Sequence, residues 1–289
     1  MLQDIFITGL VNGGVYALLA IGFSLIFGVA RIVNIAHTAF YMLAAYAFYT
    51  LLVRFGMGFA LAGVISVAAV VAAAVLCYKL VIEPVREHES AVLIATIALA
   101  LIFQELMLIA YGGHFLGIPS TLEGVVTFMG VSIPYQRLLI LVVAAIMLGG
   151  TWFTLYRTRL GLAIRATAND LEVANLMGMN VHRVAMATVA ISVCLAAIAG
   201  VVVAPVFVVD PFMWLSPLVT MLAIVVLGGL GSLKGSLIGA FIIGYVEAIT
   251  VFALPAGAFL KGAVALTIMV AVLLARPEGL FGVAFEEER

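Results

Sequence analysis

The sequence predicts an all-α, polytopic membrane protein, and two features of its composition point to this class. Hydrophobic residues make up 66% of the 289 residues, and charged residues make up 9%. A soluble domain contains about 45–50% apolar and about 25% charged residues. The chain therefore has too few charged side chains to cover the surface of a soluble fold of its length.

The length of the apolar stretches decides between helices and strands. A helix needs about 20 mostly apolar residues to cross the hydrocarbon layer. The stretches lack the alternation of a barrel strand, so helices are the structure that satisfies the backbone in lipid. We expect one transmembrane domain over residues 1–289 with about eight spanning helices, some of them re-entrant or broken. Nine stretches reach or approach the required length: 5–27, 32–53, 58–82, 91–111, 138–155, 184–208, 215–233, 235–253 and 262–275.

Two interruptions separate apolar stretches in corresponding parts of the chain. Gly22–Gly28 leads into Asn34-Ile-Ala-His37, and Gly228-Gly-Leu-Gly231-Ser-Leu-Lys-Gly235 divides an apolar stretch of almost 40 residues. Paired breaks occur around the central pathway of internally repeated transporters. The alternative interpretation is that the glycines only allow close packing of helices. The sequence does not decide between the two.

The distribution of Lys and Arg predicts the orientation, because these residues gather on the cytoplasmic side. If the segment 156–183 is cytoplasmic, the charge balance is ten inside against three outside, and the C-terminus is cytoplasmic too. The predicted outside residues are Arg54, Arg137 and Lys261. The predicted inside residues are Arg31, Lys79, Arg86, Arg157, Arg159, Arg165, Arg183, Lys234, Arg276 and Arg289.

Several function classes are excluded or disfavoured. The order Leu233-Lys234-Gly235-Ser236 does not match a phosphate-binding loop, which has glycine directly before the lysine. Cys77 and Cys194 lie in apolar stretches and do not form a metal-binding spacing. The net charge of −1 does not indicate nucleic-acid binding. We therefore expect no enzyme activity, no cofactor and no nucleic-acid partner.

The one long polar segment, residues 156–183, is predicted to contain a short helix. Asn169 is a candidate N-cap, and Glu172 follows three residues later as in a capping box. Asp170 and Glu172 also place negative charge where the helix dipole favours it. These residues predict that the helix starts close to position 170.

The same short helix is predicted to carry an apolar stripe. Val173, Leu176 and Met177 follow the i, i+3, i+4 spacing, and Gly178 and Asn180 provide a C-terminal stop. A short apolar helix between two membrane spans suits a groove on a partner protein. The alternative is that the stripe packs on the helix ends of this chain.

Four sequence blocks resemble a known family. Glu172-Val-Ala174 with Gly178 resembles the coupling motif of ABC importer permeases, although Val173 replaces its central alanine and the later Ile-x-Leu-Pro is missing. The wider blocks resemble the branched-chain amino-acid permeases, and the chain length is typical of their H-type subunit. These blocks are Gly161–Asn180, Asn34–His37, Gly228–Gly235 and Arg276–Gly282.

The resemblance implies a subunit of a bacterial inner-membrane importer for branched-chain or related amino acids. Its implied partners are a second homologous permease, two ATPase subunits and a periplasmic substrate-binding protein, all acting at the lipid bilayer. ATP is hydrolysed by the partners in such a system. The implied ATPase-coupling residues are Asp170, Glu172, Ala174, Leu176, Met177 and Gly178.

Four polar residues within apolar stretches are candidates for the substrate pathway. Glu105 and Glu247 are predicted to lie in the outer third of the membrane, where a carboxylate could attract the ammonium group of an amino acid. Asn34 and His37 lie at the first interruption. Each of the four residues also has a structural interpretation, as a hydrogen-bonded group between helices.

Two rival functions remain open at this stage. The first is a permease of the same class that carries an amide, urea or a sugar. The second is a self-sufficient secondary transporter or channel, in which Glu105 or Glu247 would bind the coupling ion. The predicted loop helix argues against the second rival, because a solitary carrier has no use for an ATPase-docking element.

Overall fold

The computed structural model describes residues 1–119, 124–128 and 131–282. Within this part of the chain, seven helices are long and apolar enough to cross a membrane. The predicted all-α, polytopic class is therefore confirmed. The seven helices are α1 (Leu2–Ala30), α3 (Phe59–Cys77) with its continuation to Val85, α4 (Glu89–Tyr111), α5 (Tyr135–Arg157), α8 (Val181–Val203), α10 (Leu233–Ala253) and α11 (Gly257–Ala275).

Two of the nine predicted stretches form shorter helices. The stretch 32–53 begins as a helix only at His37, giving α2 (His37–Tyr49) and the π-helix η1 (Thr50–Arg54). The stretch 215–233 forms α9 (Leu215–Gly228), which ends at the glycine-rich break. A small antiparallel hairpin of β1 (Val125–Phe128) and β2 (Val131–Pro134) lies between α4 and α5, and the sequence did not predict it.

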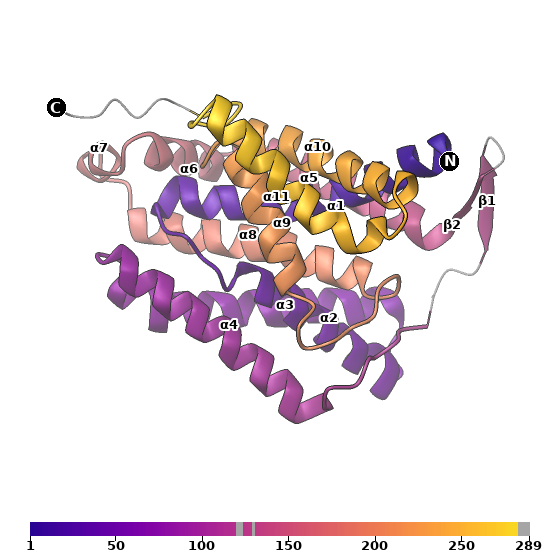
Figure 1. Ribbon diagram of the computed structural model, residues 1–289. Coiled ribbons are helices and arrows are strands. Elements are labelled where there is room, and N and C mark those ends of the chain that lie inside the picture. The colour runs from indigo at the N-terminus through magenta and orange to yellow at the C-terminus, as the bar shows by residue number, and fades with distance from the viewer. Residues whose placement is uncertain (120–123, 129–130, 283–289) are drawn as a thin grey trace.

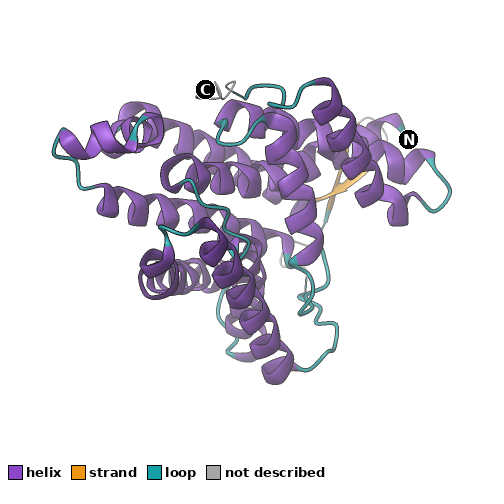
Figure 2. Ribbon diagram, turned by 60° about the vertical axis from the view of Figure 1, so that its left-hand side comes forward, coloured by secondary structure: helices purple, strands orange, loops and turns teal. Residues whose placement is uncertain are grey.

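The helices form a buried centre and a more exposed periphery. Helices α1, α2 and α8 have the largest numbers of buried residues in this centre, and α1 packs along both α10 and α8 (Figures 1 and 2). Helices α3, α4, α5 and α11 lie around this centre and expose large apolar side chains. Such side chains suit contact with lipid tails or with other membrane helices.

Glycines bring the backbones of α1 and α10 together. A Cβ atom at Gly244 would lie 2.6 Å from the backbone nitrogen of Gly13, and one at Gly9 would lie 2.4 Å from the ring of Tyr245. A residue larger than glycine at position 9 or 244 would therefore overlap the neighbouring helix. Small residues at helix interfaces allow this close approach in membranes.

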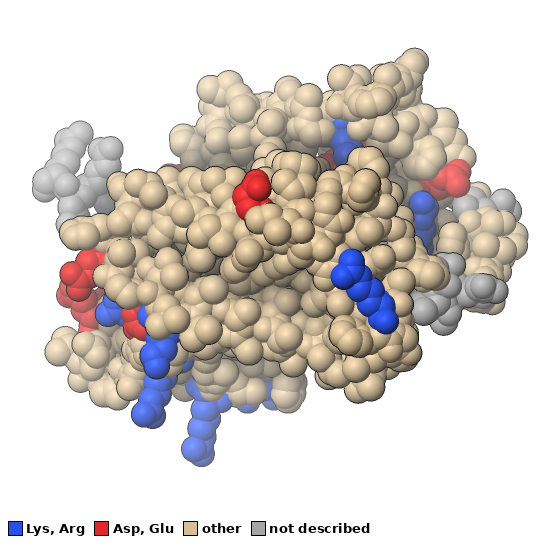
Figure 3. All heavy atoms as spheres, turned by 90° about the horizontal axis from the view of Figure 1, so that it is seen from below, with Lys and Arg blue, Asp and Glu red and all other residues tan. Residues whose placement is uncertain are grey.

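The two ends of the molecule differ in what they carry. The segment 156–183 and the last described residues lie at one end, while the N-terminus and the hairpin lie at the other (Figure 1). Asn169 and Gly282 line the same pocket, so the two segments are neighbours. On the face shown in Figure 3, most charged side chains lie towards the two ends. The cytoplasmic position of the first end stays a prediction, and Arg289 lies outside the described residues.

The close contact of α1 and α10 predicts the effect of a single methyl group. Gly244→Ala should lower the free energy of unfolding by about 1–3 kcal/mol, because the methyl group overlaps the backbone of α1. Gly262→Ala on α11 is the matched control, since no atom lies within 4 Å of the added group. The measurement is thermal unfolding of both variants in detergent. Equal unfolding temperatures would contradict the packing described here.

The charge distribution predicts which end faces the cytoplasm. In a variant without Cys77 and Cys194, a cysteine at position 170 should react with an impermeant thiol reagent only after the cells are opened. A cysteine in place of Phe259, which is exposed near the opposite end, should react in intact cells. Ready labelling of position 170 from outside would reverse the predicted orientation.

Candidate functional site

The polar segment after α5 is held close to the helix bundle. The Thr158 hydroxyl accepts a hydrogen bond from the backbone N–H of Gly161 at 3.1 Å and caps α6 (Arg159–Asn169). Arg165 donates from Nε to the carbonyl of Leu155 at 3.1 Å. Arg31 at the end of α1 donates to the carbonyl of Ala168 at 3.2 Å. Helix α6 is therefore tied to the ends of both α5 and α1.

The short helix α7 (Leu171–Leu176) follows, and its cap differs from the predicted one. Asn169 is the last residue of α6, and Asp170 is the N-cap of α7. Asp170 has an extended backbone, and its Oδ1 accepts the N–H of Val173 at 2.9 Å. The prediction of a cap at Asn169 was wrong by one residue, because the chain already turns out of α6 between the two positions. Glu172 lies in the first turn of α7, where a negative charge was expected.

The apolar side chains of α7 point away from this chain. Leu176 is 85% exposed and Met177 is 77% exposed, and Leu171 and Val173 are exposed too. Ala174 alone is buried and holds the helix against the bundle. The predicted stripe therefore exists and does not pack on the helix ends of this chain.

The end of α7 depends on Gly178. Its φ of +80° lies in the left-handed region that glycine adopts without strain. This turn allows the N–H of Met179 to bond to the carbonyl of Ala174 at 3.2 Å. An added Cβ would meet no atom within 4 Å, so the backbone conformation is what favours glycine here.

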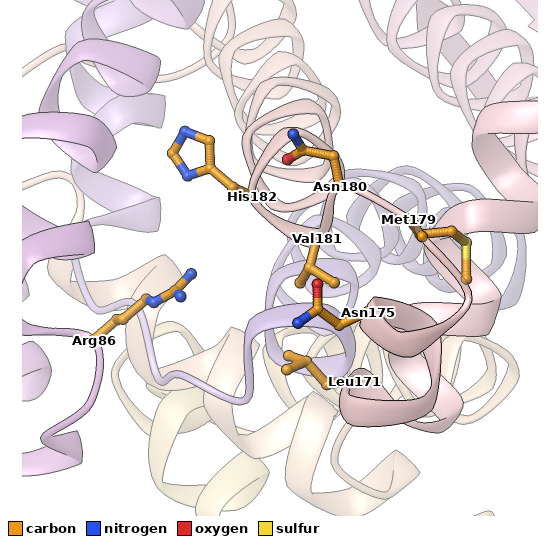
Figure 4. A pocket seen from close by; sticks show the side chains of 8 residues that line it. Arg86, Leu171, Asn175, Met179, Asn180, Val181 and His182 are labelled. Atoms are coloured by element: carbon orange, nitrogen blue, oxygen red, sulfur yellow. The ribbon is translucent and has the colours of Figure 1, made fainter.

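A pocket of about 440 Å³ opens beside α7 (Figure 4). Arg86 reaches towards it from the segment before α4, opposite Leu171 and Asn175. A contact between the His182 imidazole and the Glu83 carboxylate joins the start of α8 to the same segment. Sequence reasoning missed this pocket, because Arg86 lies at least 85 residues before the other residues that line it. The lining residues are Arg86, Leu171, Asn175, Gly178, Met179, Asn180, Val181 and His182.

Two of the blocks that carry the family resemblance lie against each other. The backbone N–H groups of Leu280 and Phe281 donate to the carbonyls of Leu227 and Gly228 at 2.8 and 3.1 Å. The C-terminal block therefore pairs with the break between α9 and α10. A pocket of about 670 Å³ lies between this contact and the ends of α1 and α6, beside Asn169.

Glu247 is a buried connection between three helices. Its side chain is 1% exposed. It accepts a hydrogen bond from the Tyr16 hydroxyl at 2.6 Å and one from the Thr220 hydroxyl at 3.5 Å. These bonds join α10 to α1 and α9. Sequence reasoning missed both partners, because no local pattern links Glu247 to residues 231 and 27 positions away.

The other three candidates for the pathway lie in different places. Glu105 points outwards from α4, while the neighbouring Gln104 points inwards and accepts a hydrogen bond from Trp214 Nε1 at 2.9 Å. Asn34 and His37 are buried at the entrance to α2. Among the described residues, Asn34 Oδ1 and both ring nitrogens of His37 have no hydrogen-bond partner. The four residues do not form one cluster.

Comparison with known proteins identifies the family of this chain. Residues 5–273 match the family model described as "Branched-chain amino acid transport system / permease component". The chain belongs to this family. It is 31% identical to the high-affinity branched-chain amino acid permease protein BraD of Pseudomonas aeruginosa, over 96% of this chain and 94% of the relative. It is also 31% identical to LivH of Escherichia coli K12, over 97% and 95% of the two chains.

A solved structure supports the fold alone. PsaBC from Streptococcus pneumoniae, solved in complex with Fab, matches with a TM-score of 0.51 at 17% identity, over 96% of this chain and 92% of that chain.

As a member of the branched-chain permease family, the chain is a multi-pass transport subunit and not an enzyme.

The environment of Glu247 predicts a structural role. Glu247→Gln keeps an acceptor for the Tyr16 hydroxyl and should change the stability little. Glu247→Leu and Tyr16→Phe should each destabilise the protein by about 1–3 kcal/mol, because each leaves a buried polar partner without its hydrogen bond. The double variant should cost less than the two single changes added together, since both remove the same bond. Thermal unfolding checks this. Normal stability with reduced uptake in Glu247→Gln would instead place the carboxylate in the substrate pathway.

Proposed function

We propose that this chain is the permease subunit of an ABC importer for branched-chain or related amino acids. It forms part of the translocation pathway, and partner ATPase subunits hydrolyse the ATP. The observation that carries this proposal is the apolar face of α7, which is capped, stopped and left uncovered by the rest of the chain. Such a face fits the groove of a partner protein in the helix-in-groove mode.

The contacts of α6 connect α7 to the membrane helices, so that a movement of α7 can be transmitted to them. Arg165 ties α6 to α5, and Arg31 ties it to the end of α1. The pocket beside Asn169 places the same end next to the break between α9 and α10. A displacement of α7 by an ATPase would therefore act on α1 and on this break together.

The proposed partners are two ATPase subunits, a second homologous permease and a periplasmic substrate-binding protein. The protein resides in the bacterial inner membrane with its C-terminus in the cytoplasm. The ten-to-three charge bias supports this orientation, because it places α7 on the side where ATP is available.

The proposed cargo follows the names of the relatives, which are branched-chain amino acid permease proteins. An amide, urea or a sugar is the alternative cargo within the same class. Asn34 and His37 are the proposed pathway residues with the strongest support, because their buried side-chain polar atoms have no hydrogen-bond partner among the described residues. Glu105 and Glu247 remain weaker candidates for contact with the substrate.

Truncation of the α7 face tests the coupling proposal. Leu176→Ala and Met177→Ala should each weaken ATPase binding by about 1–3 kcal/mol, because each removes an apolar anchor from the interface. Phe259→Ala is the control, since this side chain is 90% exposed but lies near the opposite end. The measurement is co-purification of the ATPase subunits together with uptake of labelled leucine. Normal values for both α7 variants would remove α7 from the interface.

The left-handed turn at Gly178 provides a second, independent test. Gly178→Val should weaken ATPase binding and uptake, because a β-branched residue strains this turn. Gly178→Asn should retain most of both, since asparagine tolerates the left-handed region. Both variants should insert and fold normally. Equal effects of the two substitutions would show that the backbone conformation at Gly178 is not what coupling requires.

A further inference from the structure

The pocket beside Asn169 lies where four parts of the chain meet. Its walls come from the ends of α1 and α6, the break between α9 and α10, and the block Arg276–Gly282. The pocket volume of about 670 Å³ is within the range of about 300–1,000 Å³ that ligand pockets occupy. Leu230 and Phe281 supply large apolar side chains that are 45% and 47% exposed. A group bound in this pocket would therefore contact both α6 and the break.

Arg31 is the cationic residue of the pocket wall. It is the C-cap of α1, and its φ of +54° lies in the left-handed region where glycine is favoured. A non-glycine residue persists in this region where other contacts hold it. Its Nη2 donates to the carbonyl of Ala168, and a guanidinium has five N–H groups. Among the described residues Arg31 forms no ion pair, with the wall residue Glu278 or with any other carboxylate. The guanidinium therefore has donors left for an anionic group.

The sequence that follows the pocket wall carries matching groups. Residues 283–289 lie outside the described residues and have the sequence Val-Ala-Phe-Glu-Glu-Glu-Arg. They start directly after Gly282, which lines the pocket and packs so closely on Gly229 that a Cβ at position 229 would overlap its backbone nitrogen. At no more than about 3.6 Å per residue, Phe285 can lie up to about 11 Å from Gly282. The segment 283–289 is therefore long enough to enter the pocket from its own wall.

We propose that the segment 283–289 folds back into this pocket as an intramolecular ligand. Phe285 would pack against Leu230 and Phe281, and the three glutamates 286–288 would lie at Arg31. Because the segment is attached to the pocket wall, its effective concentration is high, and individually weak contacts are sufficient. Docked there, it would join α6 to the break between α9 and α10 and oppose a movement of one without the other. The docking does not rest on the proposed function, whereas its consequence for coupling does.

Disulfide trapping of the full chain in membranes tests the docking. In the variant without Cys77 and Cys194, cysteines in place of Glu287 and Asn169 should form a bridge under mild oxidation. A cysteine in place of Lys234 is the matched control for position 169, because Lys234 is exposed beside the break but does not line the pocket. The bridge to position 169 should form at least about tenfold faster, as docking raises the local concentration. Equal rates, or a bridge from position 287 to another protein, would overturn the proposal.

The charge of Arg31 is tested with the same bridge. Arg31→Glu should slow its formation by roughly 2- to 5-fold, the range for one exposed ion pair. Lys234→Glu changes the net charge of this end of the molecule equally and should leave the rate unchanged. Equal slowing by both substitutions would show general attraction only and contradict the proposed contact.

A substitution within the segment gives an independent check, because Arg31 also holds Ala168. Phe285→Ala should slow the bridge by about tenfold, since burial of a phenylalanine side chain contributes at least this factor. An unchanged rate would remove Phe285 as the apolar anchor and overturn the docking as proposed. The assay needs no ATPase subunit, so its outcome is separate from that of the proposed coupling through α7.

Discussion

The close contact between α1 and α10 is the constraint on which the rest of the structure depends. Gly9, Gly13 and Gly244 bring the two backbones together, and the hydrogen bond from Tyr16 to Glu247 fixes the same pair of helices one turn further along. One contact is apolar and depends on shape, and the other is polar and depends on direction. Together they determine how α1 and α10 are rotated against each other. The break before α10 and the end of α1 are therefore held in a fixed relation, and the pocket beside Asn169 forms between them.

This arrangement explains why a peripheral helix of six residues can matter for transport. Asp170 joins the two short helices, because its N–H bonds to Ala166 at the end of α6 and its side chain caps α7. Helix α6 is fixed to the ends of α1 and α5 through Arg31 and Arg165. The side chains of Leu176 and Met177 are 85% and 77% exposed and contribute little to the packing of this chain. A partner protein that covers these apolar side chains would account for their exposure in the isolated chain.

The sequence predicted the features that depend on local patterns. Apolar length located the spanning helices, and the spacing of Val173, Leu176 and Met177 located an exposed helical face. Features that depend on distant residues were missed. The partners of Glu247 come from two other helices, and the pocket beside Arg86 joins segments far apart in the chain. The cap at Asp170 was misplaced by one residue because Asn169 and Asp170 are both good caps, and the turn out of α6 decides between them.

Hydrogen–deuterium exchange of the permease with and without its ATPase subunits tests the central claim most directly. The account predicts that binding of the ATPase slows exchange at the backbone amides of residues 171–179, where α7 and its left-handed turn lie. Peptides from the opposite end, including the start of α11, should exchange at the same rate in both samples. Protection confined to other segments, with unchanged exchange across α7 in a complex that contains the ATPase, would contradict the account.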